Sequence, residues 1–227
     1  MKITIPIILL CSCAVFAEDA LPQYFPISTN RSIENAIDPF CSQWYGGHLI
    51  RMQEPSLLAA TNRTDLAVYR FTYLPTWGRP LAVRAVVTTN QVYVRTVRLT
   101  GDGGYAPGDI GQTVERVLTN GLPKDVSQLI DKTIWNENFQ PKSHRGCDGS
   151  EWIVEGVKSG KYRLITMWTP DAYSKDPQGK LFVTLSEALA ELSGDKMSKV
   201  MLDCHSLDLK TDPLRYGNPK QGMEHSR

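Results

Sequence analysis

The stretch GCDGSEWIVEGVKSGKYRLITMWTP (residues 146–170) carries the most regular pattern in the chain and decides the fold. Two runs rich in β-branched and aromatic residues flank Ser159-Gly160, and short Gly-containing connections of this kind are typical of tight hairpin turns. A glycine-bounded segment, 146–149, leads into the first run, and Pro170 follows the second. The stretch therefore predicts a β-hairpin that turns at Ser159-Gly160.

Pairing the two strands across this turn separates their side chains into two faces, because successive residues of a strand point to opposite sides. One face is apolar and is expected to meet the core; it carries Trp152, Val154, Ile165 and Met167. The other face is mixed, and the register places Val157 opposite Tyr162, Glu155 opposite Leu164, and Glu151 near Trp168.

Glu151 and Glu155 lie among apolar residues on that mixed face. A carboxylate in such surroundings needs a charged or hydrogen-bonding partner. We expect an arginine of a neighbouring strand, Arg84, Arg95 or Arg98, to supply it. The alternative is that these carboxylates face a cleft and act in function.

Outside this stretch, some segments show helical periodicity and others show strand periodicity. Asp38-Pro39 predicts the start of a helix that ends at Pro55, although Gly46-Gly47 weakens it and calls for compensating packing. Further predicted elements are strands at 68–73, 81–88, 91–99 and 112–118, a helix opened by Pro123, and a helix with an apolar stripe over 181–192.

These strands cluster instead of alternating with helices. That order favours an antiparallel sheet over a doubly wound parallel one. We predict a single α+β domain, an antiparallel sheet of about five to six strands with three helices packed on it. The glycine-rich loop 101–108 matches no phosphate-binding signature and is interpreted as a broad turn.

The first residues have the pattern of an export signal: Lys2, an apolar run, and a small residue at Ala17. The expected organisation is a signal peptide over 1–17, an extended leader over 18–30, the domain over 31–207 and a flexible tail over 208–227. Export to the periplasm or the extracellular space follows. The alternative is a lipoprotein anchored at Cys13.

In an oxidising compartment the cysteines of the mature chain can pair. A disulfide between Cys147 and Cys204 would tie the tail to the central hairpin, but sequence alone does not fix the pairing. The alternative is that Cys41, Cys147 and Cys204 are thiols that pack as small hydrophobic residues.

The composition is near neutral, with a formal net charge of +1, and contains no polybasic run. It therefore gives no argument for nucleic acid as a partner. The apolar run near the start is too short to favour a membrane-spanning helix, and we expect none in the mature chain. Neither a cofactor nor a metal is expected from the motifs.

Three side-chain sets could carry chemistry. His144 with the nearby carboxylates could bind a metal, but the spacing matches no ligand signature. Cys147 with His144 or His205 could form a nucleophile and base. Asp148 with Glu151 or Glu155 could act as the paired carboxylates of a hydrolase.

Aromatic side chains near turns and strand ends give a further clue. Trp77, Tyr105 and Trp168 are the candidate binding residues, because aromatic side chains that line one cleft can hold a sugar or a peptide strand.

Several short motifs taken together resemble a family of uncharacterised exported bacterial proteins, over residues 38–192. They are DPF (38–40), WY (44–45), EPSL (54–57), YRF (69–71), LP (74–75), GGYAPG (103–108), DG (148–149) with Trp152, EG (155–156), GKY (160–162) and WTP (168–170). The resemblance implies export and a single domain, and no activity. Gly46-Gly47 departs from the more helical pair expected there.

The sequence thus favours an exported binding module without catalysis, whose partner is a protein or a cell-envelope component. One alternative is an envelope hydrolase that uses Asp148, Glu151 or Glu155. The other is an immunity or inhibitor protein that blocks a toxin, which a neighbouring toxin gene would support.

Overall fold

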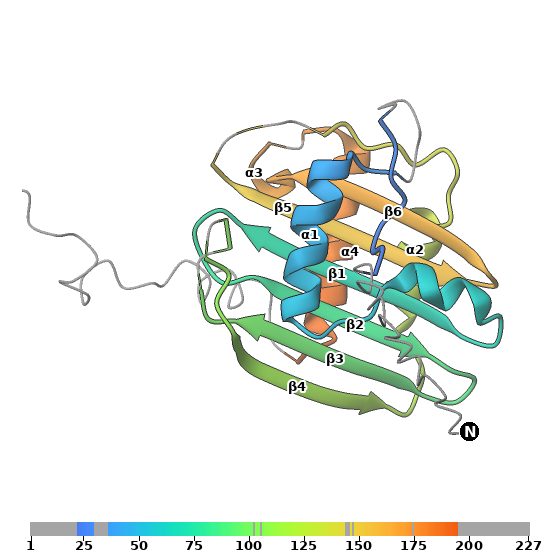
Figure 1. The fold of residues 1–227 in the computed structure, drawn as a ribbon. Coiled ribbons are helices and arrows are strands. Elements are labelled where there is room, and N and C mark those ends of the chain that lie inside the picture. The colour runs from blue at the N-terminus through green and yellow to red at the C-terminus, as the bar shows by residue number, and fades with distance from the viewer. Residues whose placement is uncertain are drawn as a thin grey trace, which may run out of the picture.

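The fold is a six-stranded antiparallel sheet covered by helices on both faces, as a computed structural model shows (Figure 1). The structure describes residues 22–29, 36–101, 103–104, 106–143, 146, 148–173 and 175–194. The strand order is β4-β3-β2-β1-β5-β6. The strands are β1 Ala67–Pro75, β2 Leu81–Val87, β3 Val92–Leu99, β4 Ile110–Leu118, β5 Ser150–Lys158 and β6 Lys161–Trp168.

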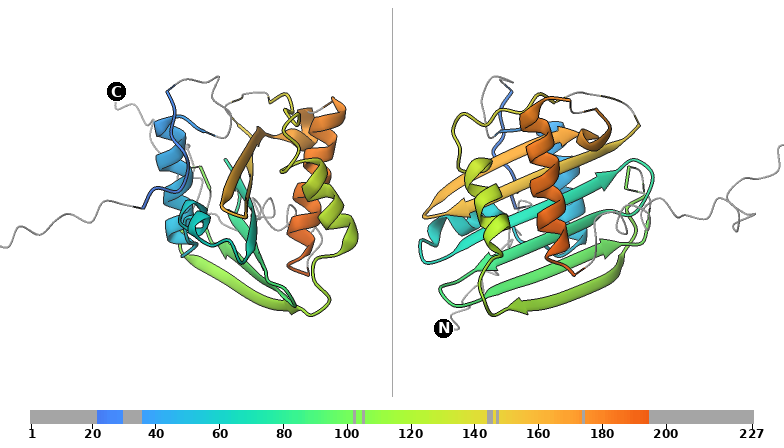
Figure 2. Two further views of the ribbon diagram at one scale, coloured as in Figure 1. Left: turned by 90° about the vertical axis from the view of Figure 1, so that its right-hand side faces the viewer. Right: turned by 180° about the vertical axis from the view of Figure 1, so that it is seen from behind.

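The helices separate into two layers. Helix α1 (Pro39–Arg51) and the short 3-10 helix η1 (Leu57–Asn62) cover one face of the sheet, and α2 (Lys124–Lys132) and α4 (Pro177–Glu191) cover the other (Figure 2). The predicted α+β domain and its three main helices are confirmed. The sequence pattern did not predict η1 or the one-turn helix α3 (Pro170–Tyr173), because both are too short to show a period.

The hairpin β5–β6 has the predicted register. Glu151 pairs with Trp168, Glu155 with Leu164, and Val157 with Tyr162. Ser159 and Gly160 both have positive φ angles, 52° and 76°, as a two-residue hairpin turn requires.

The apolar face of this hairpin meets α2 and α4. Trp152 is fully buried there, and its ring packs edge-on against Phe71 at 5.5 Å and Tyr73 at 5.9 Å between ring centroids. Phe182 and Leu185 of α4 close the same core. The strand alternation predicted from the sequence therefore places the main core where expected.

Helix α1 begins as predicted, because the Asp38 side chain accepts a hydrogen bond from the Cys41 amide at 2.9 Å. It ends at Arg51, earlier than the predicted stop at Pro55. Gln53 has a φ of 54°, a left-handed conformation that turns the chain before the proline is reached.

Gly46, the first glycine of the pair in α1, packs against a segment that precedes the helix. Gly46 is buried, and a Cβ placed on it would lie 3.4 Å from the ring of Tyr24. Tyr24 and Phe25 are both buried in the core between α1 and the sheet. Tyr24 and Phe25, part of the segment 18–30 that was expected to be an extended leader, therefore pack into the domain.

Candidate functional site

A row of charged side chains crosses the sheet on the α1 face. Glu155, Arg70, Arg84, Arg95 and Glu115 are direct cross-strand neighbours on β5, β1, β2, β3 and β4. Like charges directly opposite each other on neighbouring strands are destabilising. The three adjacent arginines therefore require anionic partners.

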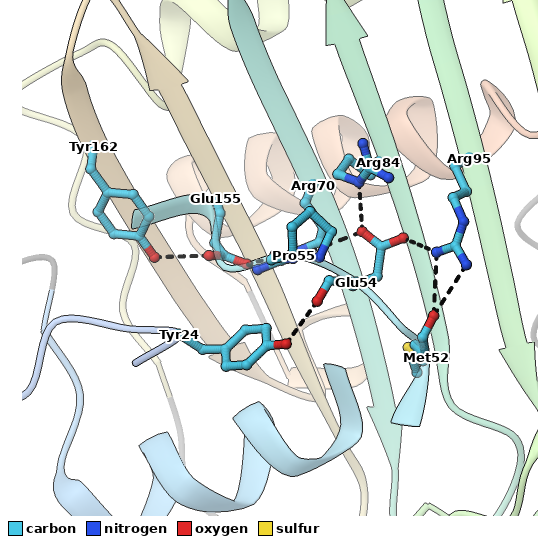
Figure 3. Close-up of polar contacts among 9 residues, drawn as sticks. All are labelled: Tyr24, Met52, Glu54, Pro55, Arg70, Arg84, Arg95, Glu155 and Tyr162. Carbon is cyan, nitrogen blue, oxygen red and sulfur yellow. Dashed lines mark hydrogen bonds and ion pairs between the residues drawn. The ribbon is translucent and has the colours of Figure 1, made fainter. Parts of the chain in front are cut away.

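Glu54 supplies the missing charge from the segment that follows α1 (Figure 3). Its carboxylate accepts a hydrogen bond from Arg84 Nε at 2.7 Å and another from Arg95 Nη1, and lies 3.9 Å from Arg70 Nη1. The side chain is fully buried. One carboxylate thus lies over all three arginines.

Backbone carbonyls of the same segment complete the network. Arg95 donates to the Met52 oxygen at 3.2 Å, Arg70 donates to the Pro55 oxygen at 2.7 Å, and Tyr24 Oη donates to the Glu54 oxygen at 2.7 Å. The network therefore fixes the chain between α1 and η1 on the sheet.

Glu155 is a buried structural carboxylate. Arg70 Nε donates to its Oε2 at 2.8 Å, Arg70 Nη2 lies 2.6 Å from the same oxygen, and Tyr162 Oη donates to Oε1 at 2.9 Å. Burial raises the pKa of Glu155, and the Arg70 charge and the hydrogen bonds from Arg70 and Tyr162 oppose that rise. An arginine of the neighbouring strand pairs with Glu155, as predicted, but it is Arg70. The predicted candidates Arg84 and Arg95 were wrong, because they bind Glu54.

A groove opens on the same face of the sheet, between the start of α1 and the ends of β5 and β6, with a volume of about 430 Å³. We call it the aromatic groove. Its lining includes Phe40, Cys41, Trp44 and Tyr45 of α1, Glu151 of β5, and Thr166 and Trp168 of β6. The structure thus brings together the predicted candidates Glu151 and Trp168.

Two side chains that line the groove, Tyr45 and Cys41, resist ionisation. Burial, and then the nearby Glu151 charge, raises the pKa of Tyr45, whose hydroxyl also hydrogen-bonds Glu151 and Cys41. Burial, with a hydrogen bond to Asp38, raises the pKa of the Cys41 thiol to about 11. Both groups are therefore neutral near pH 7.

The Trp168 ring is held by two glycines of the loop before β5. A Cβ on Gly146 would lie 2.0 Å from the ring, and a Cβ on Gly149 would lie 2.6 Å from it. The same Cβ on Gly149 would lie 2.2 Å from Thr169 Oγ1, so only glycine fits between these two side chains. These glycines let the loop pack flat against the indole and define one wall of the groove.

The other predicted site residues are dispersed. Asp148 is exposed and does not line the groove, and Trp77 is 60% exposed, also outside its lining. Glu155 lies four residues along β5 from Glu151, about 13 Å at the usual rise of a strand. Tyr105, Cys147, Cys204, His144 and His205 lie outside the described residues.

Among the described residues, no group of histidine, cysteine or acidic side chains could hold a metal ion, and Cys41 is a free thiol. Within the same part of the chain, no helix is both long and apolar enough to cross a membrane.

Sequence reasoning missed Glu54, Arg70, Cys41 and Phe40 as members of these two regions. Arg70 gave the one usable signal, because a charged residue lies in the middle of the apolar run VYRF (68–71). No family model matches the chain, and no curated protein matches it significantly.

Proposed function

We propose that this chain is an exported binding module without catalysis, and that its aromatic groove holds a segment of a partner protein or of a cell-envelope component. The observation that carries the proposal is the groove itself. Aromatic side chains of α1 and β6 surround two partly exposed carboxylates, Asp38 and Glu151, within about 430 Å³. Sites of this kind combine apolar contact area with a few polar groups that orient the ligand.

The chemistry of the groove supports binding over hydrolysis. Glycosidases place two carboxyl groups about 5–9.5 Å apart, whereas about 13 Å of strand separates Glu151 from Glu155. Glu155 is also enclosed by Arg70 and Tyr162. Cys41, with a thiol pKa of about 11, is a poor nucleophile near pH 7.

Phe40 offers the entry point for a ligand, because it lines the groove and remains 75% exposed. Large apolar side chains exposed beside a cleft are typical of interaction sites. Export places the groove where an envelope partner is available, and N-terminal sequencing of the mature protein, with Glu18 expected first, tests that part of the proposal.

Site-specific photocrosslinking in the producing cell tests the groove. A photoreactive amino acid at position 40 should yield a discrete crosslinked product, and one at the exposed Asn120, in the turn after β4, should not. Trp168→Ala should remove the product at position 40. A product that forms equally at both positions, or that survives Trp168→Ala, would reject the groove as the binding site.

A further inference from the structure

A second hollow, of about 560 Å³, lies beside the turn of the β5–β6 hairpin and the segment that follows α2. We call it the cationic pocket. Its lining includes Lys158, Lys161 and Arg163 from the hairpin, and Ile134, Trp135 and Glu137 from the segment after α2. None of these residues lines the aromatic groove, so the two sites are separate.

The three cations of this pocket outnumber its one acidic residue, Glu137, and form no ion pair with it. Lys158 and Lys161 are directly opposite each other across the hairpin, an arrangement that repels. Within the described residues, no hydrogen bond or ion pair joins the side chain of Lys158, Lys161 or Arg163 to another group. The Nε of Arg163 is buried and has no hydrogen-bond partner there.

This state contrasts with the arginines of the buried network. Arg70, Arg84 and Arg95 each bind a carboxylate, and together they take up Glu54 and Glu155. Five other buried side-chain atoms of the described residues, Arg70 Nη2 among them, also lack a hydrogen-bond partner, but Arg70 Nη2 lies 2.6 Å from Glu155 Oε2, whereas no ion pair reaches Arg163. A buried nitrogen in this state calls for an explanation such as a bound ion. In a chain whose net charge is only +1, three cations and a single carboxylate line this one hollow, which leaves it with an excess of positive charge.

Trp135 forms a fixed apolar wall next to these charges. Its Nε1 donates to Tyr69 Oη at 3.3 Å, which orients the indole. Gly156 provides the space, because a Cβ there would lie 2.8 Å from Ile134 and 3.4 Å from the Trp135 ring. Arg163 is the direct cross-strand neighbour of Gly156, so the cation and the indole approach the same point of the sheet.

We propose that the cationic pocket binds a phosphate-bearing ligand whose phosphate pairs with Lys158, Lys161 and Arg163 and whose ring packs on Trp135. A phosphate monoester carries close to two negative charges near pH 7, which suits three converging cations. Arginine and lysine are the usual partners of phosphate, the former as a fork of donors and the latter as a point charge. The indole adds a surface for a sugar or another ring.

Titration of the full chain, followed by the indole NMR resonance of Trp135, tests this proposal. The resonance is assigned with Trp135→Phe. The probes are inorganic phosphate, glucose 1-phosphate, glucose, and glucuronate, which offers one negative charge on a similar ring. We expect glucose 1-phosphate to bind most tightly, inorganic phosphate and glucuronate more weakly, and glucose alone not to bind. Binding should weaken as salt is added.

Arg163→Gln should lower the affinity for glucose 1-phosphate by about tenfold or more, the usual consequence of losing a charged hydrogen bond. Lys180→Gln removes the same charge from an exposed site on α4 and should leave the affinity unchanged. The double variant Lys158→Gln with Lys161→Gln provides a second test that leaves Arg163 intact. Unchanged urea denaturation would show that all three variants fold.

A second titration distinguishes a soluble phosphate from a lipid headgroup. Vesicles of phosphatidylglycerol and of phosphatidylcholine are compared in sedimentation, and binding to the former alone that is lost in Arg163→Gln assigns the phosphate to a lipid. The proposal is overturned if neither soluble phosphates nor phosphatidylglycerol vesicles bind. It is equally overturned if glucuronate binds as tightly as glucose 1-phosphate, or if Lys180→Gln and Arg163→Gln have the same effect.

Discussion

Glu155 and Glu151 lie four residues apart on the same face of β5, yet one is enclosed in the buried network and the other faces the aromatic groove. Their cross-strand neighbours explain the difference. Glu155 lies opposite Arg70 of β1 and Leu164 of β6, whereas Glu151 lies opposite Leu74 and Trp168. The carboxylate next to an arginine is part of the buried network, and the one next to apolar and aromatic residues lines the groove, where the Tyr45 hydroxyl hydrogen-bonds it.

What covers the sheet differs as well. The segment Met52 to Pro55 lies over the charged row and brings the Glu54 carboxylate with it. Above Glu151 lies the start of α1, which contributes Cys41, Trp44 and Tyr45 and leaves a groove. The network therefore fixes the end of α1 to the sheet, and the start of the same helix forms the wall of the groove.

The largest effect is expected from Arg70→Met. The substitution leaves Glu155 without its ion pair in a fully buried site, which typically lowers the free energy of unfolding by about 3–5 kcal/mol. Arg63→Met is the matched control, because its ion pair with Asp65 is exposed and such pairs contribute about 0–1 kcal/mol. Urea denaturation measures both. Equal effects would mean that the buried network is not structural.

The next largest effect is expected in the groove, where folding should slow the alkylation of Cys41. A rise in thiol pKa from 9.0 to about 11 lowers the thiolate fraction at pH 8 about hundredfold. Alkylation by iodoacetamide, followed by mass spectrometry of the peptide that contains Cys41, should be slower by about that factor in the folded chain than in urea. Equal rates would mean that water enters the groove freely and that the Cys41 thiol is not desolvated.

The sequence predicted what depends on local pattern. Alternation and the Ser159-Gly160 turn were enough to place Glu151 opposite Trp168, and Asp38-Pro39 was enough to start α1. These signals act within a few residues, so their consequences do not depend on how the distant parts of the chain meet.

The partners of the carboxylates could not be predicted in the same way. The choice of Arg70 for Glu155 depends on β5 pairing with β1, two strands that are far apart in sequence. Glu54 reaches the arginines because Gln53 adopts a left-handed conformation. That conformation is usually signalled by a glycine or an asparagine, and this position has neither. Arg70 within VYRF showed that a buried charge needs a partner, but not which one.

Tyr162 belongs to the buried network and Tyr45 to the aromatic groove, so removing each hydroxyl compares the two regions directly. Tyr162→Phe removes a donor from the buried Glu155 and should lower the free energy of unfolding by about 1–3 kcal/mol. Tyr45→Phe should have a smaller effect, because its partner Glu151 is partly exposed to water. Tyr93→Phe, at an exposed site on β3, is the control and should change stability by less than about 0.5 kcal/mol.

The same tyrosines predict a loss of stability in alkali. Burial, followed by the Glu155 charge, raises the folded-state pKa of Tyr162 above the ordinary value of 10, so the unfolded chain releases its proton first. The stability that depends on the neutral phenol is therefore present below pH 10 and is lost as the pH rises above it. Tyr162→Phe should show a shallower decline between pH 9 and pH 11 than the wild type. An identical slope would contradict the burial of its hydroxyl.

The smallest effect concerns the helix that connects the two regions. No atom lies within 4 Å of a Cβ placed on Gly47, so Gly47→Ala should raise the free energy of unfolding by about 0.5–1 kcal/mol. Gly46→Ala should raise it as well, because its Cβ would make an ordinary van der Waals contact with the Tyr24 ring at 3.4 Å. Urea denaturation gives both values, and a loss of stability in Gly46→Ala would show that the new Cβ displaces Tyr24, which holds Glu54 through a hydrogen bond. Crosslinking from position 40 should be unchanged in Gly47→Ala, because this change stiffens α1 without altering the lining of the groove.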